Sequence, residues 1–91
     1  MDQTQIDAFK ADLDREGYSH ATRSWEPGYQ MDEHSHDFNV KGLILSGSFS
    51  ITTEAGTETY SQGQSFTMST GCPHSEAAGP EGVSFLVGRK D

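Results

Sequence analysis

Apolar side chains in residues 1–17 follow a helical pattern. They recur every three to four positions and form one narrow stripe on an otherwise polar segment: Ile6, Phe9 and Leu13. Thr4 is the expected N-cap residue, and Gly17 is the expected residue just past the C-terminal end. The sequence therefore predicts an N-terminal helix. We expect its stripe to lie against the outside of the following domain or against a second subunit.

From residue 18 onward the pattern changes to short strands separated by glycine, proline and polar turns. Alternation with a period of two is typical of strands, because successive side chains point to opposite faces. The predicted strands are 21–25, 40–45, 48–53, 58–60, 65–68, a segment beginning at His74, and 83–87. The turns expected between them include 26–28, 54–57, 62–63 and 79–82. This spacing predicts one all-β domain over residues 18–91, either a sandwich or a barrel.

Composition narrows the classes of partner. The chain of 91 residues has a net charge of −8, and its few basic residues form no cluster. Tight binding to a phosphate backbone needs such a cluster, so we expect neither nucleic acid nor an anionic membrane as a partner. A domain this small buries only about 60% of its unfolded surface. With a hydrophobic fraction of 32%, it stands to gain from a partner subunit.

The expected compartment is the cytoplasm. The first ten residues, MDQTQIDAFK, contain neither the basic nor the apolar region of a signal peptide. Apolar runs are also far shorter than the roughly 18 residues that a membrane span needs. The single cysteine, Cys72, excludes an internal disulfide and suits a reducing compartment.

Three histidines form the main candidate site. His34 and His36 are two positions apart, so on a regular strand they project from the same face. His74 on a neighbouring strand can complete a triangle of three nitrogens. Imidazole is the commonest metal ligand among side chains and suits Zn, Cu, Fe and Ni. The alternative is a pair of exposed histidines in a polar loop.

The residues around these histidines fall into two longer motifs. The first has Gly28, His34, His36, Val40 and Gly47 at its key positions, and the second has Gly63, Ser69, Gly71, His74 and Ala78. This resembles the cupin superfamily, whose motifs read G-x5-H-x-H-x3-E-x6-G and G-x5-P-x-G-x2-H-x3-N. Every glycine and histidine falls at the family's spacing, over residues 28 to 78. Three other positions depart from the motifs: Val40 replaces the glutamate, Ser69 the proline and Ala78 the asparagine.

The resemblance implies a small antiparallel jelly-roll barrel and a homodimer. It also implies one divalent transition metal, Fe, Mn, Ni, Cu or Zn, held by His34, His36 and His74. If the strand stays regular past His36, Phe38 and Val40 face inward with the histidines and Lys41 faces out. The family's glutamate position is then apolar, and a three-histidine centre keeps a full +2 charge that favours anionic ligands.

Glu76 is the nearest inward carboxylate, because it shares a strand face with His74. It is a candidate catalytic base, second-shell partner of the ligands or fourth ligand. Cys72 is a weaker candidate ligand, and His20 is expected on the surface or in packing. Arg89 can anchor a carboxylate or remain solvated. Candidate walls of the pocket are Tyr29, Met31, Phe38, Phe66 and Met68.

Two functions remain open. The first is a metal-dependent enzyme acting on a small anionic or oxygen-rich metabolite. The ligand set is similar to that of three-histidine thiol and β-diketone dioxygenases, and to that of small cupins that isomerise or open sugar acids. The second is a non-catalytic cupin that binds a metal or a small molecule as a sensor or accessory protein.

Overall fold

The computed structural model describes residues 2–91, which form one helix followed by six strands. The elements are α1 (Gln3–Arg15), β1 (Ser19–Trp25), β2 (Gln30–His34), β3 (Asn39–Thr53), β4 (Gly56–Ser61), β5 (Ser65–Met68) and β6 (His74–Lys90). The predicted all-β class with an N-terminal helix is confirmed. Strand β5 has the bounds that alternation predicts, β1, β3, β4 and β6 extend beyond theirs, and no bounds were predicted for β2.

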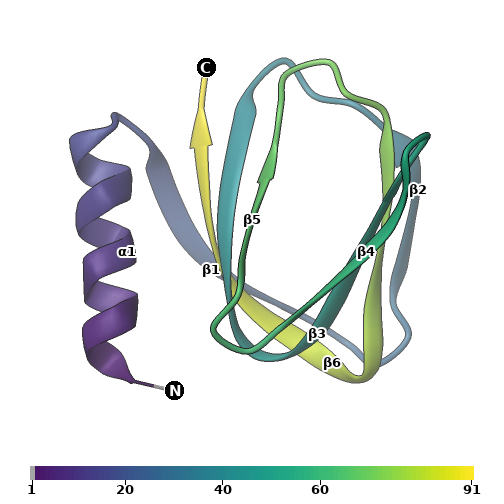
Figure 1. Ribbon diagram of the computed structural model, residues 1–91, viewed down its shortest axis with the longest axis horizontal. Coiled ribbons are helices and arrows are strands. Elements are labelled where there is room, and N and C mark those ends of the chain that lie inside the picture. The colour runs from purple at the N-terminus through teal and green to yellow at the C-terminus, as the bar shows by residue number, and fades with distance from the viewer. Residues whose placement is uncertain (1) are drawn as a thin grey trace.

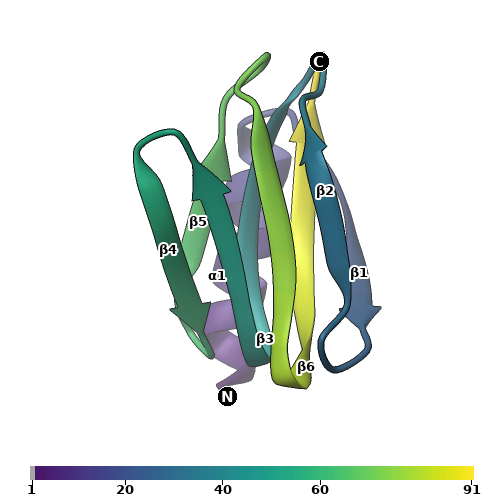
Figure 2. The ribbon, with the colours of Figure 1, turned by 90° about the vertical axis from the view of Figure 1, so that its right-hand side faces the viewer.

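Two long strands, β3 and β6, organise the domain. They pair antiparallel from Asn39 opposite Lys90 to Thr52 opposite Ser75, and both bend half-way (Figure 1). One half of the pair is flanked by β1 and β5, and the other half by β2 and β4. Figures 1 and 2 show the result as two layers that face each other and meet where β3 and β6 bend. This is a jelly-roll arrangement whose sheet does not close fully.

The bends correct one prediction. The sequence predicted separate strands at 40–45 and 48–53 and a turn at 79–82, but each region belongs to one continuous strand. Register shifts near Gly47 let β3 turn without losing its partner. Gly47 has a φ of 74°, and a Cβ there would lie 2.1 Å from the carbonyl oxygen of Gly82. Glycine at this position therefore lets the two bent strands cross in close contact.

The helix is fixed at both ends by its own side chains and backbone. Asp2, not Thr4, is the N-cap residue, since its carboxylate accepts a hydrogen bond from the Thr4 amide at 2.9 Å. The predicted role of Gly17 at the other end is confirmed. It has a φ of 84°, and the amide of Tyr18 after it donates to the Leu13 carbonyl at 2.8 Å.

Two apolar clusters lie on opposite faces of the long strands. The outer cluster joins the helix to the barrel through Leu13, Leu43 and Leu86, with Ile6 and Phe9 packed against it. The inner cluster fills the space between the layers and includes Ile44, Phe49, Ile51, Phe66 and Phe85. The predicted stripe of the helix therefore covers the barrel's outer face. The helix in residues 2–91 is too short and too polar to cross a membrane.

Assembly stays a prediction. Strands β1, β2, β4 and β5 each pair with one neighbour among residues 2–91, so their other edges offer places where a second copy can add. Light scattering over a concentration series tests the expected homodimer. A mass equal to one chain at every concentration would reject it.

Candidate metal centre

His34, His36 and His74 meet at the end of the barrel opposite the bends. His34 is the last residue of β2 and pairs in register with His74, the first residue of β6. Their ring centroids lie 4.5 Å apart. His36 lies in the connection after β2, not on a strand as predicted, and its ring centroid is 4.8 Å from that of His74. The amide of Gly71 holds this connection by donating to the His36 carbonyl at 2.9 Å.

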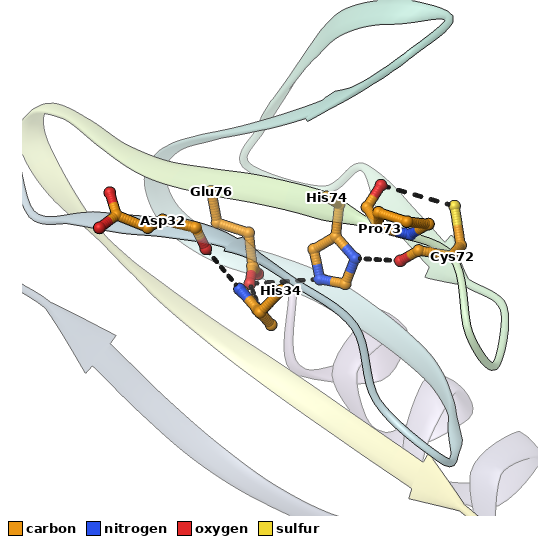
Figure 3. Close-up of polar contacts among 6 residues, drawn as sticks. All are labelled: Asp32, His34, Cys72, Pro73, His74 and Glu76. Carbon is orange, nitrogen blue, oxygen red and sulfur yellow. Dashed lines mark hydrogen bonds and ion pairs between the residues drawn. The ribbon is translucent and has the colours of Figure 1, made fainter.

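Glu76 approaches the same point from β6. Its Oε1 lies 3.0 Å from His34 Nε2 and 3.4 Å from His74 Nε2, and Figure 3 shows the three side chains converging. The residue is only 9% exposed. One potential ligand atom from each of the four side chains, His36 included, lies within 4.8 Å of every other. The structure thus brings together all four residues that the sequence singled out, and their roles remain to be tested.

Backbone carbonyls fix the orientation of two imidazoles. His34 Nδ1 is 2.7 Å from the Asp32 carbonyl oxygen, and His74 Nδ1 is 2.8 Å from that of Cys72 (Figure 3). A carbonyl oxygen only accepts hydrogen bonds, so each Nδ1 carries the proton and donates it. In the neutral ring the lone pair is then on Nε2, the nitrogen that faces Glu76. Metal-ligating histidines commonly donate their other ring N–H to a carbonyl in this way.

The centre holds more acceptors than donors. Two Nε2 lone pairs face one carboxyl oxygen, an arrangement that is repulsive unless a proton or a cation lies among them. Within residues 2–91, His74 Nε2 and His36 Nδ1 are buried without a hydrogen-bond partner. Buried polar atoms without partners are rare and demand an explanation. A cation coordinated by these atoms would satisfy them, so the residues present fit a metal ion.

Burial shifts two of the titrations at this centre. Desolvation raises the pKa of Glu76, and its electrostatic contacts with His74 and His34 oppose that rise in part. Desolvation also lowers the pKa of His36, aided by repulsion from His74, His34 and Arg89. Both shifts favour the neutral forms. The imidazole of His36 is therefore ready to ligate, whereas Glu76 tends to keep a proton until a cation replaces it.

A cavity of about 390 Å³ opens in front of the centre. Its walls are mostly apolar and include Trp25, Met31, Phe38, Val40, Phe66 and Met68. Of the predicted wall residues only Tyr29 is absent from this lining; its side chain packs against Trp25 and is 45% exposed. Cavities of this size and character hold small molecules.

Comparison with solved structures identifies the architecture. A cupin-2 domain protein from Shewanella frigidimarina superposes with a TM-score of 0.70 at 17% identity, over 81% of this chain and 71% of that one. The protein has the cupin fold. No protein-family model and no curated protein matches the sequence, so the relationship is visible in the structure and in the two motifs.

Two enzymes share this cupin fold over part of their length. The polyketide cyclase RemF from Streptomyces resistomycificus matches at 22% identity and a TM-score of 0.70, over 80% of this chain and 54% of that one. A variant of oxalate decarboxylase from B. subtilis matches at 24% identity and a TM-score of 0.71, over 81% of this chain and 21% of that one. At these identities the likeness concerns the fold alone.

The cupin motif's glutamate position has no carboxylate. Val40 occupies it, is buried, and lines the cavity with Phe38, as strand alternation predicts. Lys41 points outward to an ion pair with Glu16 of the helix end. A carboxylate ligand must therefore come from another part of the chain, and within residues 2–91 Glu76 is the carboxylate that clusters with the histidines.

Other candidates lie away from the centre. Cys72 contributes its carbonyl to orient His74, but its sulfur is outside the four-residue cluster and donates to the Pro73 carbonyl at 3.9 Å. His20 Nε2 lies 3.1 Å from Asp14 Oδ1 on the outer surface. Neither side chain belongs to the candidate metal centre.

Arg23 lines the cavity from β1, although the sequence did not single it out as a site residue. Trp25 is the apolar end of that strand and faces the inner cluster. Residues two apart share a face, so Arg23 had to point the same way. The two-residue spacing from Trp25 was a weak indication, because β1 has few apolar residues that mark its inner face.

Proposed function

We propose that His34, His36, His74 and Glu76 bind one divalent transition metal, and that the protein is a metal-dependent enzyme acting on a small anionic or oxygen-rich metabolite. The observation that carries the proposal is the orientation of His34 and His74. Both Nδ1 protons are used by carbonyls, which leaves both Nε2 lone pairs facing a buried carboxylate. The candidate metals remain Fe, Mn, Ni, Cu and Zn.

The spacing of the donors supports Glu76 as a fourth ligand. Two ligands that each lie about 2.1 Å from one ion, at tetrahedral or octahedral angles, are separated by roughly 3.0–3.4 Å. The two separations from Glu76 Oε1 to the histidines, 3.0 and 3.4 Å, fall in that range. The carboxylate would then replace the ligand that Val40 cannot supply. It would also remove part of the metal's positive charge.

Glu76 has a second possible task. Burial raises its pKa and so favours the protonated form, and its side chain faces the cavity. A bound metal would supply a Lewis acid with open positions for an anionic oxygen. The chain itself would exclude water with the apolar walls and orient the ligands through the Asp32 and Cys72 carbonyls. Glu76 would exchange a proton with the bound molecule.

Catalysis is the further step of the proposal. Two structural neighbours, RemF and oxalate decarboxylase, are enzymes, which supports a catalytic use of the fold without assigning their reactions to this chain. The cavity beside the metal ligands, with its mostly apolar walls, supports it too. A cupin that only binds a metal or small molecule is the alternative, and turnover separates the two.

Metal analysis of the purified protein is the first test. We expect one equivalent of metal per chain in the wild type and loss of that equivalent in His34→Ala and His74→Ala. His20→Ala is the matched control, since its ring lies on the outer surface beside Asp14. Equal metal content in all variants would reject the site.

The second test measures turnover. O₂ uptake and substrate loss are followed with small anionic substrates, using the metal-loaded wild type and Glu76→Gln. Retained metal with lost turnover in Glu76→Gln would assign proton transfer to this residue. Loss of metal would make it a ligand, and tight metal without turnover in the wild type would favour the binding protein.

A further inference from the structure

Two arginines line the approach to the metal centre. Arg23 on β1 faces both the metal cavity and an adjoining hollow of about 300 Å³, and Arg89 near the end of β6 faces that second hollow. The two hollows share Arg23, Phe38, Val40 and Val87 in their walls. The two hollows therefore adjoin, with His34 and His36 lining the first, Arg89 lining the second, and Arg23 lining both.

Strand pairing places both arginines on the inner face. In the β1–β6 ladder, Arg23 lies opposite Phe85, and Arg89 lies opposite Ser19. Arg23 shares its face with Trp25, and Arg89 shares its face with Phe85. The guanidinium of Arg89 lies over the ring of Phe38, 4.1 Å from its centroid. This stacking holds the planar group at the rim of the cavity.

Among the described residues, neither arginine is held in a close ion pair, in contrast to Arg15 and Lys41. Arg15 pairs with Asp12 and Lys41 pairs with Glu16, both on the outer side of the domain. Within residues 2–91 Arg23 has no ion-pair partner, and the nearest carboxylate to Arg89 is the exposed Asp91 at 3.9 Å. In a chain with 14 acidic and 6 basic residues, two guanidinium groups without a close carboxylate therefore lie beside the same hollow. Their charge is available to an incoming anion.

We propose that Arg23 and Arg89 form an anion subsite that binds one carboxylate of a small organic acid, while a second anionic group of the same molecule reaches the His34, His36 and His74 centre. The inference rests on the proposed function for the metal end, but the arginine end stands independently. The ligand class is therefore a short dicarboxylate or a comparable acid with two anionic ends. Arginine suits this role because its fork donates two parallel hydrogen bonds to a carboxylate.

Calorimetric titration of the full chain with succinate tests the subsite, with propionate as a probe that has one anionic end. In EDTA, we expect succinate to bind the wild type, and Arg23→Gln and Arg89→Gln each to weaken it roughly ten- to hundredfold. After loading with Zn²⁺, succinate should bind more tightly and propionate should gain less. Arg15→Gln is the matched control, because it removes the same charge from the outer helix.

The outcomes separate the two proposals. In His74→Ala, Zn²⁺ should no longer increase the affinity for succinate, but the arginine-dependent binding in EDTA should remain. Absence of metal binding in the wild type would reject only the proposed function. No succinate binding to the wild type, or equal weakening in Arg15→Gln, would overturn the subsite. Equal affinity of propionate and succinate for the Zn²⁺-loaded chain would overturn the two-ended ligand. Circular dichroism verifies that all variants fold, as expected for the three arginine variants because their side chains are exposed.

Discussion

The two faces of β3 and β6 differ in how completely their groups are satisfied. On the outer face, Leu43 and Leu86 are covered by Leu13 of the helix, and all three are almost fully buried. On the inner face, His74 and Glu76 are buried as well, yet His74 Nε2 has no hydrogen-bond partner within residues 2–91. The same pair of strands thus carries a complete apolar contact and an incomplete polar one. We infer that the outer face stabilises the fold and that the inner face is completed by a ligand.

Truncating the outer cluster should have the largest effect on stability. Leu13→Ala removes a buried side chain and leaves a cavity under the helix, which costs about 2–5 kcal/mol. Metal stoichiometry should not change, since Leu13 contacts only the outer face. Urea unfolding and metal analysis of one preparation measure both. Parallel losses of stability and of metal would show that the two faces are not independent.

A substitution where the two bent strands cross should destabilise the fold almost as much as Leu13→Ala. Gly47→Ala places a Cβ against the Gly82 carbonyl and forces alanine into a left-handed backbone conformation, for about 1–3 kcal/mol or more. Gly28→Ala is a matched control, because Gly28 has the same φ of 74° but no atom within 4 Å of the added carbon. Thermal unfolding of both variants separates the clash from the backbone strain. Equal losses would mean that close approach at the bend contributes nothing.

A glutamate at position 40, where the cupin motif has its carboxylate, tests whether the inner face is completed by a metal ion. Val40→Glu buries a charge beside the cavity, so the metal-free variant should be less stable than the wild type. Added Mn²⁺ or Zn²⁺ should restore stability and bind more tightly, while the affinity for anionic ligands should fall. Denaturant unfolding with and without metal tests this. An unchanged metal affinity would mean that Val40 does not face the ion.

The smallest expected effect is the pH dependence of the metal-free protein. Burial raises the folded-state pKa of Glu76 above its ordinary value of 4.5, so the contribution of this residue to stability is complete below pH 4.5. That contribution is lost as the pH rises through the raised pKa. In EDTA, Glu76→Gln should remove this part of the pH dependence, and bound metal should also suppress it. Unfolding free energies that depend on pH equally in the two proteins would contradict the assignment.

Much of this fold is encoded locally, and the rest depends on contacts between distant segments. The motif histidines and glycines identified the cupin fold, and alternation placed Phe38 and Val40 in the cavity. The segment 79–82 was misread because Gly-Pro-Glu-Gly is typical of a turn, whereas its pairing partners keep β6 continuous through it. The Thr4 cap was wrong by two residues, because Asp2 offers a carboxylate to the same end of the helix.

The candidate site likewise depends in part on local sequence and in part on contacts between distant segments. The sequence brought His34, His36, His74 and Glu76 into one hypothesis through spacing and strand parity. It could not show that the carbonyls of Asp32 and Cys72 orient two of the rings, since this depends on how the loops close. Arg23 escaped notice because its place beside the cavity follows from the pairing of β1 with β6, more than fifty residues away in sequence.

Anomalous diffraction at the absorption edge of the metal found in the purified protein is the most direct test of the central claim. Crystals of the wild-type protein should show one strong peak within about 2.0–2.3 Å of a ring nitrogen of His34, His36 and His74. An oxygen of Glu76 should lie at a similar distance. A peak elsewhere, or no peak in protein that carries one equivalent of metal, would contradict the account.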